Sequence, residues 1–194
     1  DGERRWDDDR FRVHFAYSSW QGEGQWRHMS PEDAGLYKTY NHHSQTSVRL
    51  RSVGTWSTAK YYPLLLLEDT ELHRTHFFEV LVGGTGWQIE LCARGHREDS
   101  TLCVFLGSAC EGNDGWTLTL APGERYTTCP ALYGCVEGGF EEAVAALTGA
   151  KRALALRRLP GGVPPLCFND YMNCLWALPT REKLIPLMDA AARV

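Results

Sequence analysis

The sequence predicts a mainly β chain: an antiparallel β-sandwich, then a linker helix, then one strand–loop–helix unit of a (β/α)8 barrel. Three observations predict this order. Short apolar or alternating segments separated by turn residues fill the chain from Asp1 to Val136. A helical period replaces them between Gly138 and Arg158. A proline- and glycine-rich stretch then leads into the last unit.

The β-rich part is predicted from alternation and turn spacing. Phe11, Val13, Phe15 and Tyr17 alternate with Arg12, His14 and Ala16, as in a strand with one buried face. The stretch from Val48 to Ser52 alternates in the same way. Further strands are expected at residues 63–67, 77–82, 87–92, 102–106 and 116–120, with turns at 83–86, 111–115 and 121–123. Many short strands at near-regular spacing are typical of an antiparallel sandwich.

One apolar helical face follows the predicted strands. It is formed by Phe140, Ala143, Val144, Leu147, Ala150 and Leu154. Acidic residues in the first turn and basic residues near the end suit the helix dipole. Pro160 to Pro165 is the clearest linker in the chain. We therefore expect a sandwich domain with its C-terminal helix over 1–160 and the start of a barrel over 161–194.

The last segment has the pattern of one barrel unit. Pro165 to Phe168 is an apolar run that ends in Asn169-Asp170, and barrel folds place binding residues at such strand ends. Thr180 is a candidate helix cap. Leu184, Leu187, Met188 and Ala191 share the apolar face of the helix that follows. Because Pro186 removes a hydrogen bond, the regular helix is expected to start there, after a looser first turn.

The same stretch resembles the first barrel strand and helix of glycoside hydrolase family 36, the α-galactosidases and their relatives. The resemblance is carried by Phe168-Asn169-Asp170-Tyr171-Met172-Asn173 at the turn and by Thr180-Arg181-Glu182-Lys183-Leu184-Ile185 at the helix start. Upstream, Gly86 to Glu90 and Leu120 to Glu124 look like strand motifs of the family's N-terminal domain. Tyr171 and Met172 depart from the family pattern, which usually has tryptophan and often glutamate there.

The resemblance implies a fold and an activity. The β region corresponds to the family's β-supersandwich, whose first strands are expected to lie upstream of Asp1. The parent protein is expected to hydrolyse terminal α-galactosides with retention of configuration, by double displacement. Both catalytic aspartates lie on later barrel strands in the family, so this chain is expected to hold no catalytic residue and to be inactive alone. The family's sandwich takes part in subunit contacts, which implies a homo-oligomer.

Four residues are candidate contacts for an α-galactoside or related oligosaccharide. A carboxylate at Asp170 can accept hydrogen bonds from two sugar hydroxyls, and a helix cap or a loop salt bridge is its structural alternative. Asn169 either contacts sugar or ties the strand end to its neighbours. Tyr171 and Trp176 supply an apolar wall against the sugar ring, although packing beneath the loop explains Trp176 equally well.

Two readings other than a hydrolase remain open. The chain fits a free-standing carbohydrate-binding or structural β-sandwich whose tail only mimics a barrel start. It also fits a relative that transfers galactosyl groups, because such an enzyme would share these residues.

Composition excludes several other classes of function. The net charge is −4 with no basic block, so a nucleic-acid surface has no support. The longest apolar run, Leu64 to Leu67, is far too short to span a membrane. The 7 cysteines form no C-x-x-C pair and no histidine joins them at zinc-finger spacing, so neither a metal nor a cofactor is expected. Reduced thiols of this kind are typical of a cytoplasmic protein.

Overall fold

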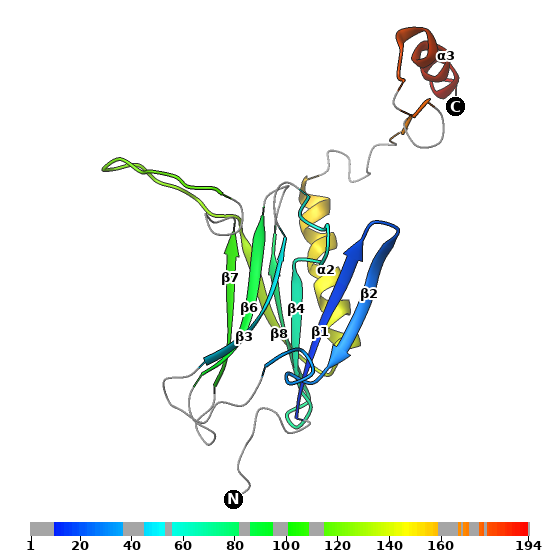
Figure 1. Ribbon diagram of the computed structural model, residues 1–194. Helices are drawn as coiled ribbons and strands as arrows, with labels where there is room; N and C mark the ends of the chain where they lie inside the picture. Colours follow the sequence, from blue (N-terminus) through cyan, green and yellow to red (C-terminus); the bar gives the residue numbers. More distant parts are fainter. Residues whose placement is uncertain are drawn as a thin grey trace, which may run out of the picture. The chain divides into compact units, whose positions relative to one another are not determined.

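The computed structural model describes residues 10–36, 45–52, 56–81, 86–94, 101–108, 115–158, 167, 169–170, 175–176 and 178–193 (Figure 1). The chain divides into two compact units, Asp1–Gly149 and Ala150–Val194. The first unit is mainly β, and both of its sheets are antiparallel, as the sequence predicts at this level.

The described strands form two sheets, with orders β2-β1-β4-β5-β8 and β3-β6-β7. The larger sheet contains β1 (Phe11–Ser19), β2 (Gly22–Met29), β4 (Leu64–Asp69), β5 (Arg74–Val80) and β8 (Ala131–Glu137). The smaller sheet contains β3 (Gln45–Ser52), β6 (Trp87–Arg94) and β7 (Thr101–Ser108). The described helices are α2 (Phe140–Arg158) and α3 (Arg181–Ala191).

Strand β4 is buried on both faces because two different layers cover it. Leu65 and Leu67 belong to an apolar cluster that includes Ile89 and Leu91 of β6 in the smaller sheet. Leu64 and Leu66 belong to a second cluster with Ala143 and Leu147 of α2. The four leucines are 0–8% exposed. A continuous apolar run is the pattern that a strand with two covered faces requires.

The cluster between the sheets is the larger of the two cores. Val13 and Phe15 of β1 meet Leu50 of β3 and Trp87 of β6 there, and each is at most 6% exposed. The indole N–H of Trp87 donates to the Ser57 carbonyl over 2.6 Å. This bond satisfies the only polar group of the ring, which burial would otherwise leave without a hydrogen-bond partner. The apolar sides of both sheets therefore share one desolvated layer.

Helix α2 covers the opposite face of the larger sheet with its first half only. Ala143 and Leu147 are buried and Phe140 packs beside them, as the helical period predicts. The prediction is wrong for Leu154, which is 38% exposed. A helix of 19 residues is about 28 Å long whereas β4, with 6, spans only about 20 Å, so the helix outruns the strand it covers. At its start, the Gly139 N–H donates to Glu142 over 2.9 Å.

One expected strand is absent from the described residues. Residues 115–130 are extended, almost wholly exposed and outside both sheets, so the strand predicted at Trp116 to Leu120 is wrong. Trp116 instead packs against Tyr126 with ring centroids 5.3 Å apart, across a turn in which the Glu124 N–H donates to Ala121. The alternation of Trp116, Leu118 and Leu120 is real, but neither sheet supplies a neighbouring strand for it.

The second unit contains α3, and Thr180 occupies its N-cap position as predicted, but the Thr180 side chain makes no capping hydrogen bond. The expected loose first turn is wrong, because the regular helix begins at Arg181 and Pro186 lies inside it. The Lys183 and Leu184 N–H groups both donate to the Thr180 carbonyl, so the first turn is closed before Pro186 is reached. No residue of α3 is buried, and Met188 is 65% exposed.

The predicted barrel strand at 165–168 lies almost entirely outside the described residues. Only Cys167 is described there; it is exposed and has no strand assignment.

Two glycine-to-alanine changes test the packing of the first unit, because one is expected to lower the free energy of unfolding and the other to raise it. A methyl group at Gly134 of β8 would overlap the ring of its cross-strand neighbour Phe77, which is buried in the α2 cluster. We expect Gly134→Ala to lower the free energy of unfolding by about 1–3 kcal/mol, since the ring must leave its place. Gly149 in α2 faces open space, so Gly149→Ala is expected to raise stability by up to about 1 kcal/mol. Urea unfolding at constant pH measures both, and equal effects of the two changes would contradict the packing described.

Candidate functional site

The structure describes three of the four predicted site residues, all in the loop before α3. Asn169 is exposed, Asp170 is half-buried and Trp176 is 61% exposed. Tyr171 lies outside the described residues. The Leu175 N–H donates to the Asp170 carbonyl over 2.7 Å. Trp176 itself has a φ of 51°, a left-handed conformation that is strained for an aromatic residue.

The structural alternatives for this loop are weakened by its geometry. Within the described residues, the Asp170 carboxylate makes no hydrogen bond or ion pair, and the residue at the N-cap of α3 is Thr180. Trp176 is too exposed to be packed beneath the loop. The Glu182 carboxylate, which accepts from its own backbone N–H and from Thr180, has a lowered pKa and stays ionised at the helix start. The loop therefore presents an aromatic face and a carboxylate to its surroundings.

A second cluster of chemical groups lies between the larger sheet and α2. His14 of β1 is 2% exposed. Its Nδ1 lies 2.7 Å from Nδ1 of His28, the register partner on β2, and its Nε2 lies 2.9 Å from the Glu68 carboxylate of β4. The ring of Phe140 at the start of α2 packs on His14 with centroids 5.4 Å apart. Three strands and one helix thus enclose a His–His–Glu chain.

The hydrogen bonds fix where the protons of this chain lie. An ionised Glu68 only accepts, so His14 must donate from Nε2 and leaves its Nδ1 unprotonated. That nitrogen then accepts from Nδ1–H of His28. Burial lowers the pKa of His14, and the hydrogen bond and charge of Glu68 only partly offset this effect. His28, at the other end of these hydrogen bonds, is exposed to solvent.

Sequence reasoning missed this cluster because alternation places His14 on the polar side of β1. That side is covered only when α2 lies on it and β2 and β4 flank it. Among the described residues, no group of three or more His, Cys, Asp or Glu side chains is arranged to hold a metal ion. His14 directs its Nδ1 at His28 and its Nε2 at Glu68, so both of its ring nitrogens are engaged in hydrogen bonds.

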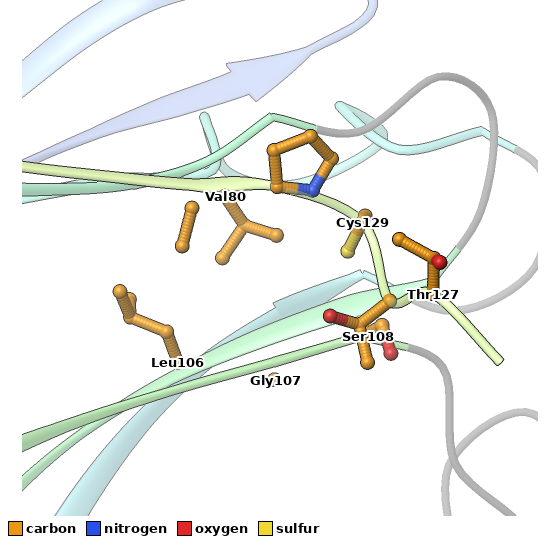
Figure 2. A pocket seen from close by; sticks show the side chains of 9 residues that line it. Val80, Leu106, Gly107, Ser108, Thr127 and Cys129 are labelled. Atoms are coloured by element: carbon orange, nitrogen blue, oxygen red, sulfur yellow. The ribbon is translucent and has the colours of Figure 1, made fainter. Parts of the chain in front are cut away.

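A third candidate is a cleft of about 540 Å³ beside the end of β7 (Figure 2). Leu106, Gly107 and Ser108 form one wall, and residues 127–131 with Val80 form the other. The lining is neutral: it offers hydroxyl groups and the Cys129 thiol but no carboxylate. Glycoside hydrolysis needs two carboxyl groups about 5–10 Å apart, so this cleft has none of the groups required for that reaction.

No family model, no curated protein and no solved structure matches this chain. Among the described residues, none of the helices is both long enough and apolar enough to cross a membrane.

The buried histidine makes the stability of the fold depend on pH. The unfolded chain protonates His14 near its ordinary pKa of 6.5, whereas the folded protein does so only at lower pH. The free energy of unfolding is therefore expected to be level well above that value and to fall as the pH drops through it. Burial raises the pKa of Asp69 and of Glu90, but hydrogen bonds from Arg10 to Asp69 and from Ser47 to Glu90 lower it further, below the usual range of each carboxyl. Both carboxyls therefore stay ionised over the pH range in which His14 titrates.

Guanidinium unfolding at three pH values measures this slope. His14→Gln is expected to be less stable at neutral pH and to lose most of the pH dependence. His73→Asn, at an exposed turn position with a φ of 48°, is the matched control and should retain it. An equally steep slope in His14→Gln would contradict the assignment.

Proposed function

We propose that this chain is part of an α-galactosidase-like glycoside hydrolase of family 36, a retaining enzyme that acts on terminal α-galactosides. In this proposal the two catalytic carboxylates lie on later barrel strands outside the 194 residues. The observation that carries it is the loop before α3, where the Asp170 carboxylate makes no bond among the described residues although it is half-buried.

The chemistry of the loop supports a sugar as the ligand. A carboxylate accepts two hydrogen bonds at once, which suits neighbouring hydroxyl groups on one ring. An aromatic face beside it, here that of Trp176, packs on the apolar C–H surface of the same sugar. Asn169 adds an amide next to the carboxylate. The hydrogen bond from the Leu175 N–H to the Asp170 carbonyl joins the segment before Trp176 to the one that holds the carboxylate.

The remainder of the chain fits the family's organisation. Two antiparallel sheets followed by a helix correspond to its β-supersandwich and linker helix. A helix without buried residues, such as α3, suits an element that packs on barrel strands. We further propose that the parent is a cytoplasmic homo-oligomer. A galactosyl-transferring relative would use the same binding residues and differ only in what accepts the sugar.

A carbohydrate-binding module is the second candidate, and one observation favours it. Trp116 and Tyr126 are 40% and 46% exposed and pack together on the extended segment at 115–130. Paired exposed rings of this kind offer a platform for a sugar chain. Under this alternative the isolated chain binds an oligosaccharide through these rings, and Trp116→Ala abolishes binding. Under the hydrolase proposal, the loop at Asp170 carries recognition.

The hydrolase proposal predicts where activity is found. The 194-residue chain is expected to cleave no p-nitrophenyl α-galactoside, whereas the chain extended through its natural downstream reading frame is expected to cleave it. Turnover by the purified short chain would overturn the proposal, because a catalytic carboxylate pair would then lie within the sheets.

In the extended enzyme, Asp170→Asn should lower kcat/KM roughly ten- to a hundredfold, since a hydrogen bond to a charged group contributes about 1.5–3 kcal/mol. Thermal midpoints should be unchanged. Asp189→Asn, an exposed carboxylate of α3, is the matched control and should leave kcat/KM unchanged. A lower midpoint with near wild-type kinetics in Asp170→Asn would assign this residue a structural role.

A further inference from the structure

A further cluster of reactive groups lies on strands β5 and β8 of the larger sheet. Cys135 of β8 is the register partner of His76 on β5, and its Sγ lies 3.8 Å from Nε2 of that ring. Nδ1 of His76 lies 3.0 Å from the hydroxyl oxygen of Tyr133, two residues before Cys135 on β8. A thiol, an imidazole and a phenol are therefore linked in one line across two neighbouring strands.

Stacking between aromatic rings holds the imidazole in place. The His76 ring lies almost parallel to the rings of Tyr133 and Phe78, at interplanar angles of 18° and 20°. Phe78 and Tyr133 are themselves register partners, with ring centroids 5.3 Å apart. Phe78 also packs against the apolar cluster between the two sheets, which anchors the row of rings to the core. The orientation of His76 is thus set by two ring contacts and one hydrogen bond.

The thiol end of this cluster is open to solvent. Cys135 is exposed, and the ring of Tyr133 is 60% exposed. On the same face of the larger sheet, Leu65 and Leu67 of β4 are buried against the smaller sheet, so the cover ends before β8 is reached. A reagent in solution can therefore reach Cys135, whereas Cys92 of β6 is buried.

The three groups have the arrangement of an activated nucleophile. In such sites the nucleophile lies within hydrogen-bond reach of a base, and a third group orients the base. A neutral His76 that carries its proton on Nδ1 donates to the Tyr133 oxygen and leaves Nε2 to accept from the Cys135 thiol. Transfer of the thiol proton to Nε2 gives the thiolate, which is the form of cysteine that attacks electrophiles.

We propose that Cys135 is a reactive thiol that forms mixed disulfides with small disulfide compounds, with His76 as its base and Tyr133 as a positioning residue. The thiol proton passes to Nε2 of His76, and the thiolate attacks one sulfur of the disulfide. A new S–S bond forms to Cys135, the original S–S bond breaks, and the leaving thiolate takes the proton from the imidazolium. Each modified Cys135 thus consumes one disulfide and releases one thiol. The proposal does not depend on the sugar chemistry of the loop at Asp170.

Reaction with glutathione disulfide tests the proposal. Mass spectrometry of peptides from the treated native chain measures how fast the mixed disulfide forms at each cysteine. Cys135 is expected to react faster than Cys167, an exposed thiol of the second unit that serves as the internal reference. His76→Gln should slow Cys135 by about tenfold or more and leave Cys167 unchanged, because a positioned base accelerates proton transfer.

Two further variants separate the base from its surroundings. Tyr133→Phe keeps the ring but removes the hydroxyl group, so it should slow Cys135 by less than His76→Gln does, with an unchanged free energy of unfolding. This variant decides the outcome if His76→Gln fails to fold. His73→Asn changes an exposed histidine in the turn before β5 and is the matched control, which should leave the rate at Cys135 unchanged.

Three results would overturn the proposal. One is a rate at Cys135 no higher than that at Cys167. The second is a rate at Cys135 that neither His76→Gln nor Tyr133→Phe lowers, since both side chains would then be structural only. The third is a loss of rate in His73→Asn as large as that in His76→Gln.

Discussion

The fold depends on one strand that is desolvated on both faces. Leu65 and Leu67 of β4 face the smaller sheet, and Leu64 and Leu66 face α2. Burying a leucine contributes roughly 1.5–3 kcal/mol, so this strand concentrates stabilisation at the centre of the larger sheet. Because the two clusters share its backbone, neither layer can leave without exposing one side of β4. The three layers are therefore expected to be energetically coupled.

The polar groups beside β4 obey the same constraint. Asp69 at its end is 6% exposed and accepts two hydrogen bonds from Arg10, at 3.0 and 2.5 Å, which compensates for burying a charge. Glu68 directs its carboxylate to His14 on the α2 side. A strand this deeply buried can carry acidic residues only where partners meet them. For Glu68 this partner is His14, which is covered by α2 and contacts His28 of β2.

The sequence predicts the elements whose side chains carry a one-dimensional signal. The leucine run of β4 reflects burial by two layers and the helical face starting at Phe140 reflects burial by one, and the structure agrees for both. The alternation of β1 predicts a strand buried on one face only, and this is wrong because His14 and Ala16 on its other face are also buried. Strands β2 and β8 lack such a pattern, because glycines and polar residues interrupt their alternation. Trp116 to Leu120 has the pattern but no neighbouring strand, and pairing is not encoded in the segment itself. Alternation alone cannot distinguish a strand from an exposed extended segment.

The candidate sites divide in the same way. Asp170 is predicted from its local sequence, in which an apolar run ends in a polar pair. His14, His28 and Glu68 are far apart in the chain and meet only through the registers of β1 with β2 and of β1 with β4. Nothing in the residues around His14 marks it as buried. The pKa of His14 is lowered because the elements packed around it bury its ring.

The central claim, that β4 couples all three layers, is tested most directly by residue-resolved hydrogen exchange of the native chain. Amides in Leu64–Asp69 are expected to exchange only through global unfolding, with a protection free energy equal to that measured by denaturant. Buried amides of β6 and of the first half of α2 are expected to approach the same limit. Faster exchange throughout α2, while β4 and β6 stay protected, would show that the helix opens independently and would contradict the coupling.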